Sequence, residues 1–171
     1  MNWNISFSNY DRILEEYYST VDKEFMENKS VMKQILQEEE DLTEIVQLVG
    51  KESLSEDQKA VLEVAKIIRE DFLQQDAFSK DDYNCPLWKT TGMMKCIVKF
   101  YTCAHSAIVE SQKTDKKLSF SVIKAHLDDE YVELSKMKTQ MPDQPKEELS
   151  AYFDGLVESI DKKFRSLASA V

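Results

Sequence analysis

The chain has 171 residues, of which 42% are hydrophobic, and its formal net charge is −10. This length and hydrophobic content suit one globular domain with a sizeable core, and they exclude a disordered chain. The negative charge argues against direct binding to nucleic acid or to an anionic membrane, because both need a basic surface. A basic protein partner and simple solubility remain as alternative explanations of the charge.

Residue usage favours helices over strands. Only three Gly and three Pro are present, too few for the many turns of a sheet-rich fold, while Glu, Lys, Leu, Gln and Met are abundant. No apolar stretch approaches the roughly 18 residues of a membrane span, and the N-terminus lacks the layout of a signal peptide. The three cysteines, Cys85, Cys96 and Cys103, form no CxxC pair, so we expect a reducing, cytosolic setting.

Apolar residues at helical spacing predict a first helix over residues 9–27 and a second over residues 29–49. The stripe of the second helix includes Ile45 and Val49 near its end. This helix also contains the acidic run Glu38–Asp41. Four adjacent carboxylates could hold a metal or a basic partner, but such a run is more typical of the solvated side of a helix.

A tight turn is predicted over residues 50–58, followed by a third helix over residues 56–75. Gly50 suits the position after a helix end, where a positive φ is favourable. Ser55 with Gln58 three residues later forms the pattern of a capping box, which opens the next helix. The turn therefore forms the tip of a helical hairpin. Its acidic residues are Glu52, Glu56 and Asp57.

Residues 76–88 show no helical period and contain Pro86. We predict an ordered loop, because its apolar side chains give it material to pack. Cys85 lies in this loop before the proline, and both a packed loop cysteine and a reactive thiol are consistent with that position. The apolar side chains of the segment are Phe78, Tyr83, Leu87 and Trp88.

Three more helices complete the prediction. A fourth, over residues 90–112, is apolar over so wide an arc that we expect it to be the most buried. A fifth begins after the N-cap Ser119 and continues to Leu134, and the last follows a linker over residues 141–145. The predicted fold is all-α, a single bundle of about six amphipathic helices with an acidic helical hairpin tip.

Sequence motifs for catalysis are nearly absent. The chain has no Gly-rich phosphate loop, no HExxH motif and no zinc-ligand spacing. Cys103 and His105 are two positions apart on a helix, so they point to different faces. Cys96 and Cys103 are most simply core residues. We therefore predict no catalytic residue, no metal site and no cofactor held by this chain.

Several runs of residues carry a family signature. They include ILQEEEDLTEIVQLVG at residues 35–50, LEVAK at 62–66, DFLQQ at 71–75, Cys85-Pro86, and FRSL at 164–167. These runs closely resemble the C-terminal region of the catalytic A subunit of V-type (vacuolar) ATPases. The resemblance covers essentially the whole chain.

The resemblance implies that residues 1–171 are the C-terminal helical domain of such an ATPase chain, as a fragment without its nucleotide-binding domain. ATP and Mg would be held by that upstream domain, so this chain alone should not hydrolyse ATP, whereas the whole subunit would drive proton transport. The implied partners are the alternating non-catalytic B-type subunits of a hexameric ring and the central-shaft (rotor) subunit. The implied location is cytoplasmic, peripheral on the cytosolic face of vacuolar or other endomembranes, with no direct membrane insertion and no nucleic acid.

Three functional segments follow from the resemblance. The hairpin turn would pass closure of the nucleotide site to the rotor as torque. Phe78, with Phe72 as a second candidate, would stack on the adenine and so line that end of the ATP site. Cys85 would form a reversible disulfide with a cysteine of the phosphate loop. The implied rotor contacts are Glu52, Ser53, Leu54, Ser55, Glu56 and Asp57.

Two departures from the related F-type beta subunit affect how the turn would work. Lys51 stands at the first acid of the D-E-L-S-E-E-D stretch that faces the shaft in that protein, and one of its two consecutive acids is missing here. Charge should therefore not be the whole mechanism, and a stiff lever with a bulky tip would serve. The alternative interpretation is a free-standing acidic helical adaptor that binds a basic partner.

Overall fold

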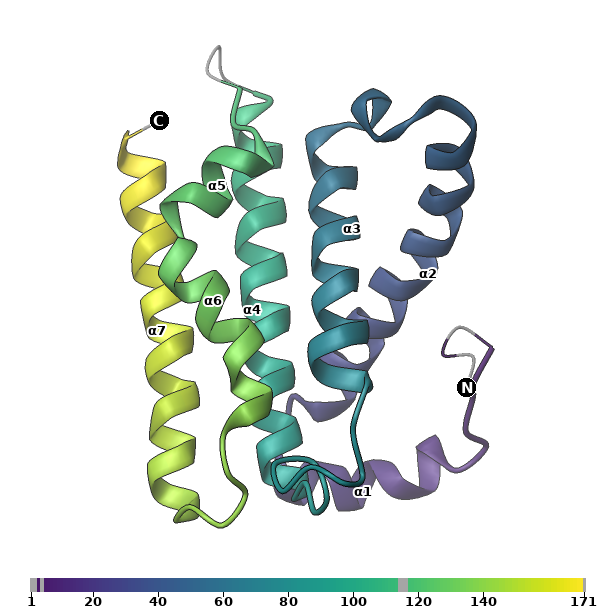
Figure 1. Ribbon diagram of the computed structural model, residues 1–171, viewed down its shortest axis with the longest axis vertical. Helices are drawn as coiled ribbons and strands as arrows, with labels where there is room; N and C mark the ends of the chain where they lie inside the picture. The colour runs from purple at the N-terminus through teal and green to yellow at the C-terminus, as the bar shows by residue number, and fades with distance from the viewer. Residues whose placement is uncertain (1–2, 4, 114–116, 171) are drawn as a thin grey trace.

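The computed structural model describes residues 3, 5–113 and 117–170, and within them every regular element is helical (Figure 1). Residues 1–2, 4, 114–116 and 171 of the predicted domain lie outside this description. The all-α prediction is confirmed. The α-helices are α1 (Asp11–Val21), α2 (Phe25–Val49), α3 (Glu56–Ile67), α4 (Leu87–Ser111), α5 (Phe120–His126), α6 (Asp128–Lys136) and α7 (Lys146–Ala170). Shorter turns are the 3-10 helices η1 (Lys51–Ser53) and η3 (Met137–Thr139) and the π-helix η2 (Ile68–Leu73).

The long helices lie side by side, and α3 packs between α2 and α4 (Figure 1). On the other side α4 packs against α7, and α5 and α6 cover these two helices. α1 lies across the end of the bundle that is lowest in Figure 1. The bundle therefore has two distinct ends, with the α2–α3 turn at one and the loop before α4 at the other.

The core is centred on α4, as its wide apolar arc predicted. Phe100 and Ile108 of this helix are fully buried, and Ile123 and Ile160 reach the same core from α5 and α7. α4 and α7 approach closely at Gly92, where a Cβ atom would lie 2.3 Å from the Phe153 ring. No real Cβ contact is that short, so glycine is needed at this crossing.

Two predicted helices are interrupted in the structure. The first ends at Val21, and Phe25 already belongs to α2. Asp22 between them is extended, with its carboxylate 2.7 Å from the backbone N–H of Glu24 and 2.5 Å from Lys95 Nζ on α4. The predicted fifth helix is likewise split at Leu127, which is fully buried. The break at Asp22 coincides with an ion pair to the distant helix α4, which helical periodicity does not detect.

Two further helix boundaries differ from the predicted ones. The regular α-geometry of the third helix ends at Ile67, and the π-helix η2 continues the chain to Leu73. The fourth helix begins three residues before the predicted start, at Leu87, with Pro86 as its N-cap. Proline is well suited to the start of a helix because it has no N–H to leave unsatisfied.

The end of α2 differs from its predicted packing. Ile45 and Val49 continue the predicted apolar stripe, yet both are exposed, because α2 lies at the outer edge of the bundle (Figure 1). Glu39 differs from the prediction in the opposite way, because its acidic run was expected on the solvated side of the helix. It is buried and pairs with Arg69 across the hairpin at 3.1 Å, so the acidic run is only partly solvated.

Among the described helices, none combines the length and the apolar content that crossing a lipid bilayer requires.

Candidate functional site

The α2–α3 turn is closed by contacts between near neighbours in sequence. Gly50 has a φ of +85°, which L side chains rarely adopt. The Ser53 hydroxyl donates to the Gly50 carbonyl at 2.7 Å, and Leu54 is buried beneath the turn. The predicted capping box between Ser55 and Gln58 is present in both directions. These contacts make the turn a rigid connection.

Glu56, one of the predicted acidic contacts, is used within the fold. Its carboxylate pairs with Lys59 at 2.7 Å and accepts the backbone N–H of Phe120 at 2.7 Å. The hydrogen bond from Lys59 lowers the pKa of Glu56, and the N–H of Phe120 lowers it further. Glu56 therefore caps the first turn of α5 from a distance and fixes the hairpin to the rest of the bundle.

A second carboxylate, Glu63, strengthens the same attachment. Lys51 of the turn reaches it at 2.8 Å, and Lys124 of α5 lies 3.6 Å away. Burial raises the pKa of Glu63, but the hydrogen bond and charge of Lys51 outweigh it, so the pKa lies below its ordinary value. Lys51, the departure from the F-type pattern, thus forms part of an internal ion pair.

The prediction that apolar side chains pack residues 76–88 is half confirmed, because Leu87 and Trp88 pack against the core whereas two aromatic residues of the loop face solvent. Phe78 is 98% exposed and Tyr83 is 78% exposed. The loop is ordered instead by polar contacts. Asp82 is buried, accepts the backbone N–H of Asp76 at 3.1 Å and pairs with Lys138 at 3.5 Å.

Lys89 is the most unusual side chain of this region, because it is only 1% exposed. Its ammonium donates to the backbone carbonyls of Asp81 at 3.1 Å, Lys138 at 2.9 Å and Gln140 at 2.6 Å. The three N–H groups of the ammonium thus have three carbonyl acceptors, so the buried charge is fully hydrogen-bonded. One ammonium joins the loop, the start of α4 and the segment after α6.

Sequence reasoning missed this role of Lys89. A signal was present, because Lys89 lies four residues before Met93 and eleven before Phe100, on the buried face of α4. A lysine within an apolar stripe needs a buried partner. The carbonyls that bind it could not be identified from local sequence.

The other predicted site residues near this loop are partly covered. Phe72 lies in η2 and packs against the core. Cys85 is half-buried, with its sulfur 3.5 Å from the Thr90 hydroxyl at the start of α4. Cys96 is fully buried, as predicted, and burial raises its pKa to about 12. No contact in the described residues tests the redox role of Cys85.

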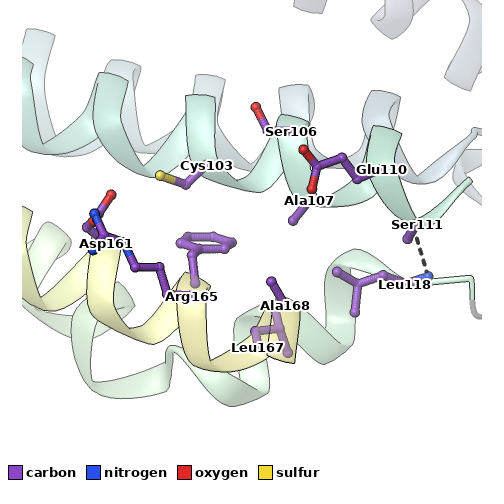
Figure 2. Close-up of a pocket in the computed structure, with 11 residues that line it drawn as sticks. Cys103, Ser106, Ala107, Glu110, Ser111, Leu118, Asp161, Arg165, Leu167 and Ala168 are labelled. Carbon is purple, nitrogen blue, oxygen red and sulfur yellow. Dashed lines mark hydrogen bonds and ion pairs between the residues drawn. The ribbon is translucent and has the colours of Figure 1, made fainter. Parts of the chain in front are cut away.

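A groove of about 330 Å³ lies between α4 and α7, where Ala107 and Ala168 face each other (Figure 2). Its walls are mostly apolar, with the Asp161–Arg165 ion pair at one side. Cys103 lines it and packs against the core from its half-buried position, and burial raises the pKa of its thiol, which makes it a poor nucleophile. Among the described residues, no three His, Cys, Asp or Glu side chains are grouped closely enough to hold a metal.

The geometry therefore presents two features at opposite ends of the bundle, the α2–α3 turn and the loop before α4, to which the exposed Phe78 belongs (Figure 1). It brings no nucleophile, base and acid together in the described part of the chain. Such an arrangement suits mechanical or binding roles, in which one end of a rigid body responds to contacts at the other.

The family comparison and the most similar curated proteins agree with each other. The family described as the C-terminal domain of V and A type ATP synthase matches residues 14–118. Over 168 residues the chain is 45% identical to the catalytic A subunit of the V-type proton ATPase of Caenorhabditis elegans, covering 98% of this chain and 28% of the relative. It is 44% identical to the corresponding protein of Manduca sexta and to isoform 1 of Drosophila melanogaster, covering 98% of this chain and 27% of each relative. The chain thus spans 27–28% of the length of these curated relatives.

Proposed function

Because the chain belongs to the family of C-terminal domains of V and A type ATP synthases, we propose that it acts as the C-terminal lever of the catalytic A subunit of a proton-translocating V-type ATPase. In this role it transmits closure of the nucleotide site, at one end of the bundle, to the central rotor shaft at the other. ATP hydrolysis itself belongs to the nucleotide domain of the whole protein, together with the bound ATP and Mg.

The observation that carries the proposal is the separation of two exposed features by rigid helices. Phe78 is 98% exposed at one end, and the capped α2–α3 turn lies at the other (Figure 1). α2 has 25 residues, which corresponds to about 37 Å of helix. A displacement at one end is therefore carried to the other with little loss, because close-packed helices deform little.

The end with Phe78 has the character of a surface that another domain covers. α1 has no buried residue, and one of its faces exposes Ile13, Tyr17 and Val21, continued by the exposed Tyr10 just before the helix. Phe78 and Tyr83 are exposed at the same end of the bundle (Figure 1). Apolar exposure on this scale marks an interaction surface. The nucleotide domain of the A subunit is the natural partner in this proposal.

Phe78 offers a flat apolar face to the adenine, on a loop that Asp82 and Lys89 hold in place. Phe72 is the weaker adenine candidate, since it already packs against the core. Cys85 remains a proposed redox site whose disulfide partner belongs to the phosphate loop of the nucleotide domain.

The proposal also specifies the neighbouring subunits of the domain and its location in the cell. As part of an A subunit it assembles with other ATPase subunits, and we propose the central shaft and the alternating B-type subunits as its direct neighbours. We place it on the cytosolic face of vacuolar or other endomembranes. The proposed shaft contacts are the residues of the turn from Glu52 to Asp57, although Leu54 is buried beneath the turn and Glu56 is already paired with Lys59.

The proposal is tested in a chimera in which this chain replaces the matching C-terminal segment of a relative's A subunit. We expect the assembled complex to hydrolyse ATP and to acidify vesicles, as measured by quenching of a pH-sensitive dye. Replacing the exposed residues Glu52 and Ser53 by Gly should preserve hydrolysis and lower proton pumping per ATP. The free-standing adaptor is favoured instead if the chimera assembles but shows no ATP hydrolysis.

A further inference from the structure

We propose that Glu63 of α3 is the positioning residue through which the α2–α3 turn and the second half of the bundle move together. This second half comprises α5 to α7, which lie on the opposite side of α3 from α2 (Figure 1). The inference rests on the proposed function, in which the domain is a lever, and it concerns how the parts of that lever are joined to one another. We call the group formed by Glu63, Lys51, Lys124 and Tyr131 the Glu63 joint.

The two oxygens of the Glu63 carboxylate contact different parts of the molecule. Oε1 pairs with the ammonium of Lys51, in the turn, at 2.8 Å. Oε2 lies 3.6 Å from the ammonium of Lys124 on α5, and it accepts a hydrogen bond from the Tyr131 hydroxyl on α6 at 3.4 Å. One carboxylate of α3 thus contacts the turn on one side and both α5 and α6 on the other.

Tyr131 is held in place by the same group of side chains. The ammonium of Lys124 lies 4.2 Å from the centre of the Tyr131 ring, which is a cation–π contact. Burial raises the pKa of Tyr131 to about 12, so its hydroxyl stays protonated at neutral pH and can donate to Glu63. Glu63, Lys124 and Tyr131 therefore contact one another pairwise, and a movement of any one of them changes two contacts.

Aromatic rings continue from Tyr131 into the core. The ring of Phe100 on α4 meets Tyr131 edge to face, with the ring centres 5.9 Å apart. Phe164 of α7 meets Phe100 in the same way at 6.0 Å. Both phenylalanines are buried, and close-packed interiors transmit a displacement because they deform little. A shift of the Tyr131 ring is therefore passed on to α4 and α7.

The Glu63 joint depends on the negative charge of Glu63. Its carboxylate is shared by two ammonium groups, those of Lys51 and Lys124. Without that charge the two ammonium groups would repel each other across the same position. The Glu63 side chain is 23% exposed, so water screens these pairs less than it screens pairs on an open surface. Neutralising Glu63 should therefore push the turn away from α5.

A double-mutant cycle measures the coupling in the 171-residue chain. Lys51→Met and Tyr131→Phe each remove one contact of Glu63, at opposite oxygens. Urea denaturation gives the unfolding equilibrium constant of both single variants and of the double variant. We expect the effect of the double variant to differ from the product of the single effects by at least about threefold. In a Glu63→Gln background the same cycle should be multiplicative to within about twofold.

The functional measurement is the number of protons pumped per ATP by the chimeric A subunit. Glu63→Gln should lower this ratio by at least about twofold. Glu63→Asp keeps the charge but is one methylene shorter, so its carboxylate cannot span both sides and the ratio should be intermediate. Glu70→Gln is the matched control, because Glu70 pairs with Lys66 at 3.9 Å on the surface and both side chains are more than half exposed. It should leave the ratio unchanged.

The outcomes separate this inference from the proposed function. If Glu63→Gln pumps as many protons per ATP as wild type, while the Glu52 and Ser53 variant pumps fewer, the lever stands and Glu63 is not its joint. A cycle that is multiplicative with Glu63 present also overturns the inference. A wild-type chimera that hydrolyses ATP but pumps no protons contradicts the proposed function, and with it this role of Glu63.

Discussion

The two ends of the bundle are held in shape by contacts of different range. At the α2–α3 turn, Ser53 reaches back three residues and Gln58 reaches back to Ser55. In the loop before α4, Lys89 reaches carbonyls that lie 49 and 51 positions later in the chain. The turn is therefore defined largely by its own sequence, whereas the loop takes its shape only after α6 and the segment following it are in place. A change in the loop framework should accordingly affect the whole fold, and a change in the turn should act locally.

The largest effect is expected from Lys89→Met, which removes the buried ammonium. Three carbonyls around this buried position then lose their donor, so the free energy of unfolding should fall by about 3 kcal/mol. Urea denaturation measures this loss. Lys113→Met, at an exposed residue just beyond the same helix, is the control and should change little. A loss below about 1 kcal/mol for Lys89→Met would show that the ammonium is not what joins these segments.

Gly50→Ala tests whether the turn depends on its backbone conformation. A Cβ at Gly50 meets nothing within 4 Å, so the only penalty is the positive φ. We expect a loss of about 1 kcal/mol in the free energy of unfolding. Gly155→Ala is the matched control, because a Cβ there also meets open space but the residue lies inside α7. It should stabilise the protein by about 0.5–1 kcal/mol, and effects of the same sign at both positions would contradict this explanation.

Glu56→Gln tests the contact between the turn and α5. The change weakens the cap on α5 and should lower the free energy of unfolding by about 1 kcal/mol near neutral pH. The pKa of Glu56 lies below its ordinary value of 4.5 in the folded protein. Its stabilisation is therefore complete above that ordinary value and is lost as the pH falls through the lowered pKa.

The difference in stability between wild type and Glu56→Gln should accordingly shrink on acidification below about pH 4.5. Denaturation curves collected across this pH range measure it. Asp57→Asn, the neighbouring acid of the turn, serves as the control. A difference that stays constant with pH would mean that the charge of Glu56 contributes nothing to the cap.

Phe78→Ala should have the smallest effect on stability, within about 0.5 kcal/mol, because the ring is almost fully exposed. In the chimeric A subunit it should raise KM for ATP by about tenfold, since the adenine loses its stacking partner. Tyr83→Ala, an exposed aromatic of the same loop, is the control for a general disturbance. An unchanged KM would remove Phe78 from the adenine site, and a large loss of stability would show that the loop packs on it.

Much of the fold follows from local patterns. Apolar spacing correctly predicted an all-helical bundle with α4 at its centre, because a helix buried on most sides must be apolar over most of its surface. Turn chemistry was equally informative, and both Gly50 and the Ser55–Gln58 capping box take the predicted conformations. These features involve residues within four positions of one another, where sequence and geometry are directly linked.

Features that depend on distant residues were not predicted. The break at Asp22 relies on Lys95 of α4, and the order of the Phe78 loop relies on Lys89. The exposure of Ile45 and Val49 was missed for the same reason, because an apolar stripe indicates a buried face without stating whether a neighbour exists to cover it.

By itself the sequence determined the helical class, the capped turn and, through its resemblance, the family. The tertiary structure decided which charges are free to meet a partner. Glu56 and Lys51 are paired with other charged side chains of the bundle, while Asp41 and Glu44 are exposed and form no salt bridge among the described residues. The sequence shows that a residue is charged but not which charges lie near it. The positions of oppositely charged groups in space decide whether the residue stabilises the fold or is left to bind another molecule.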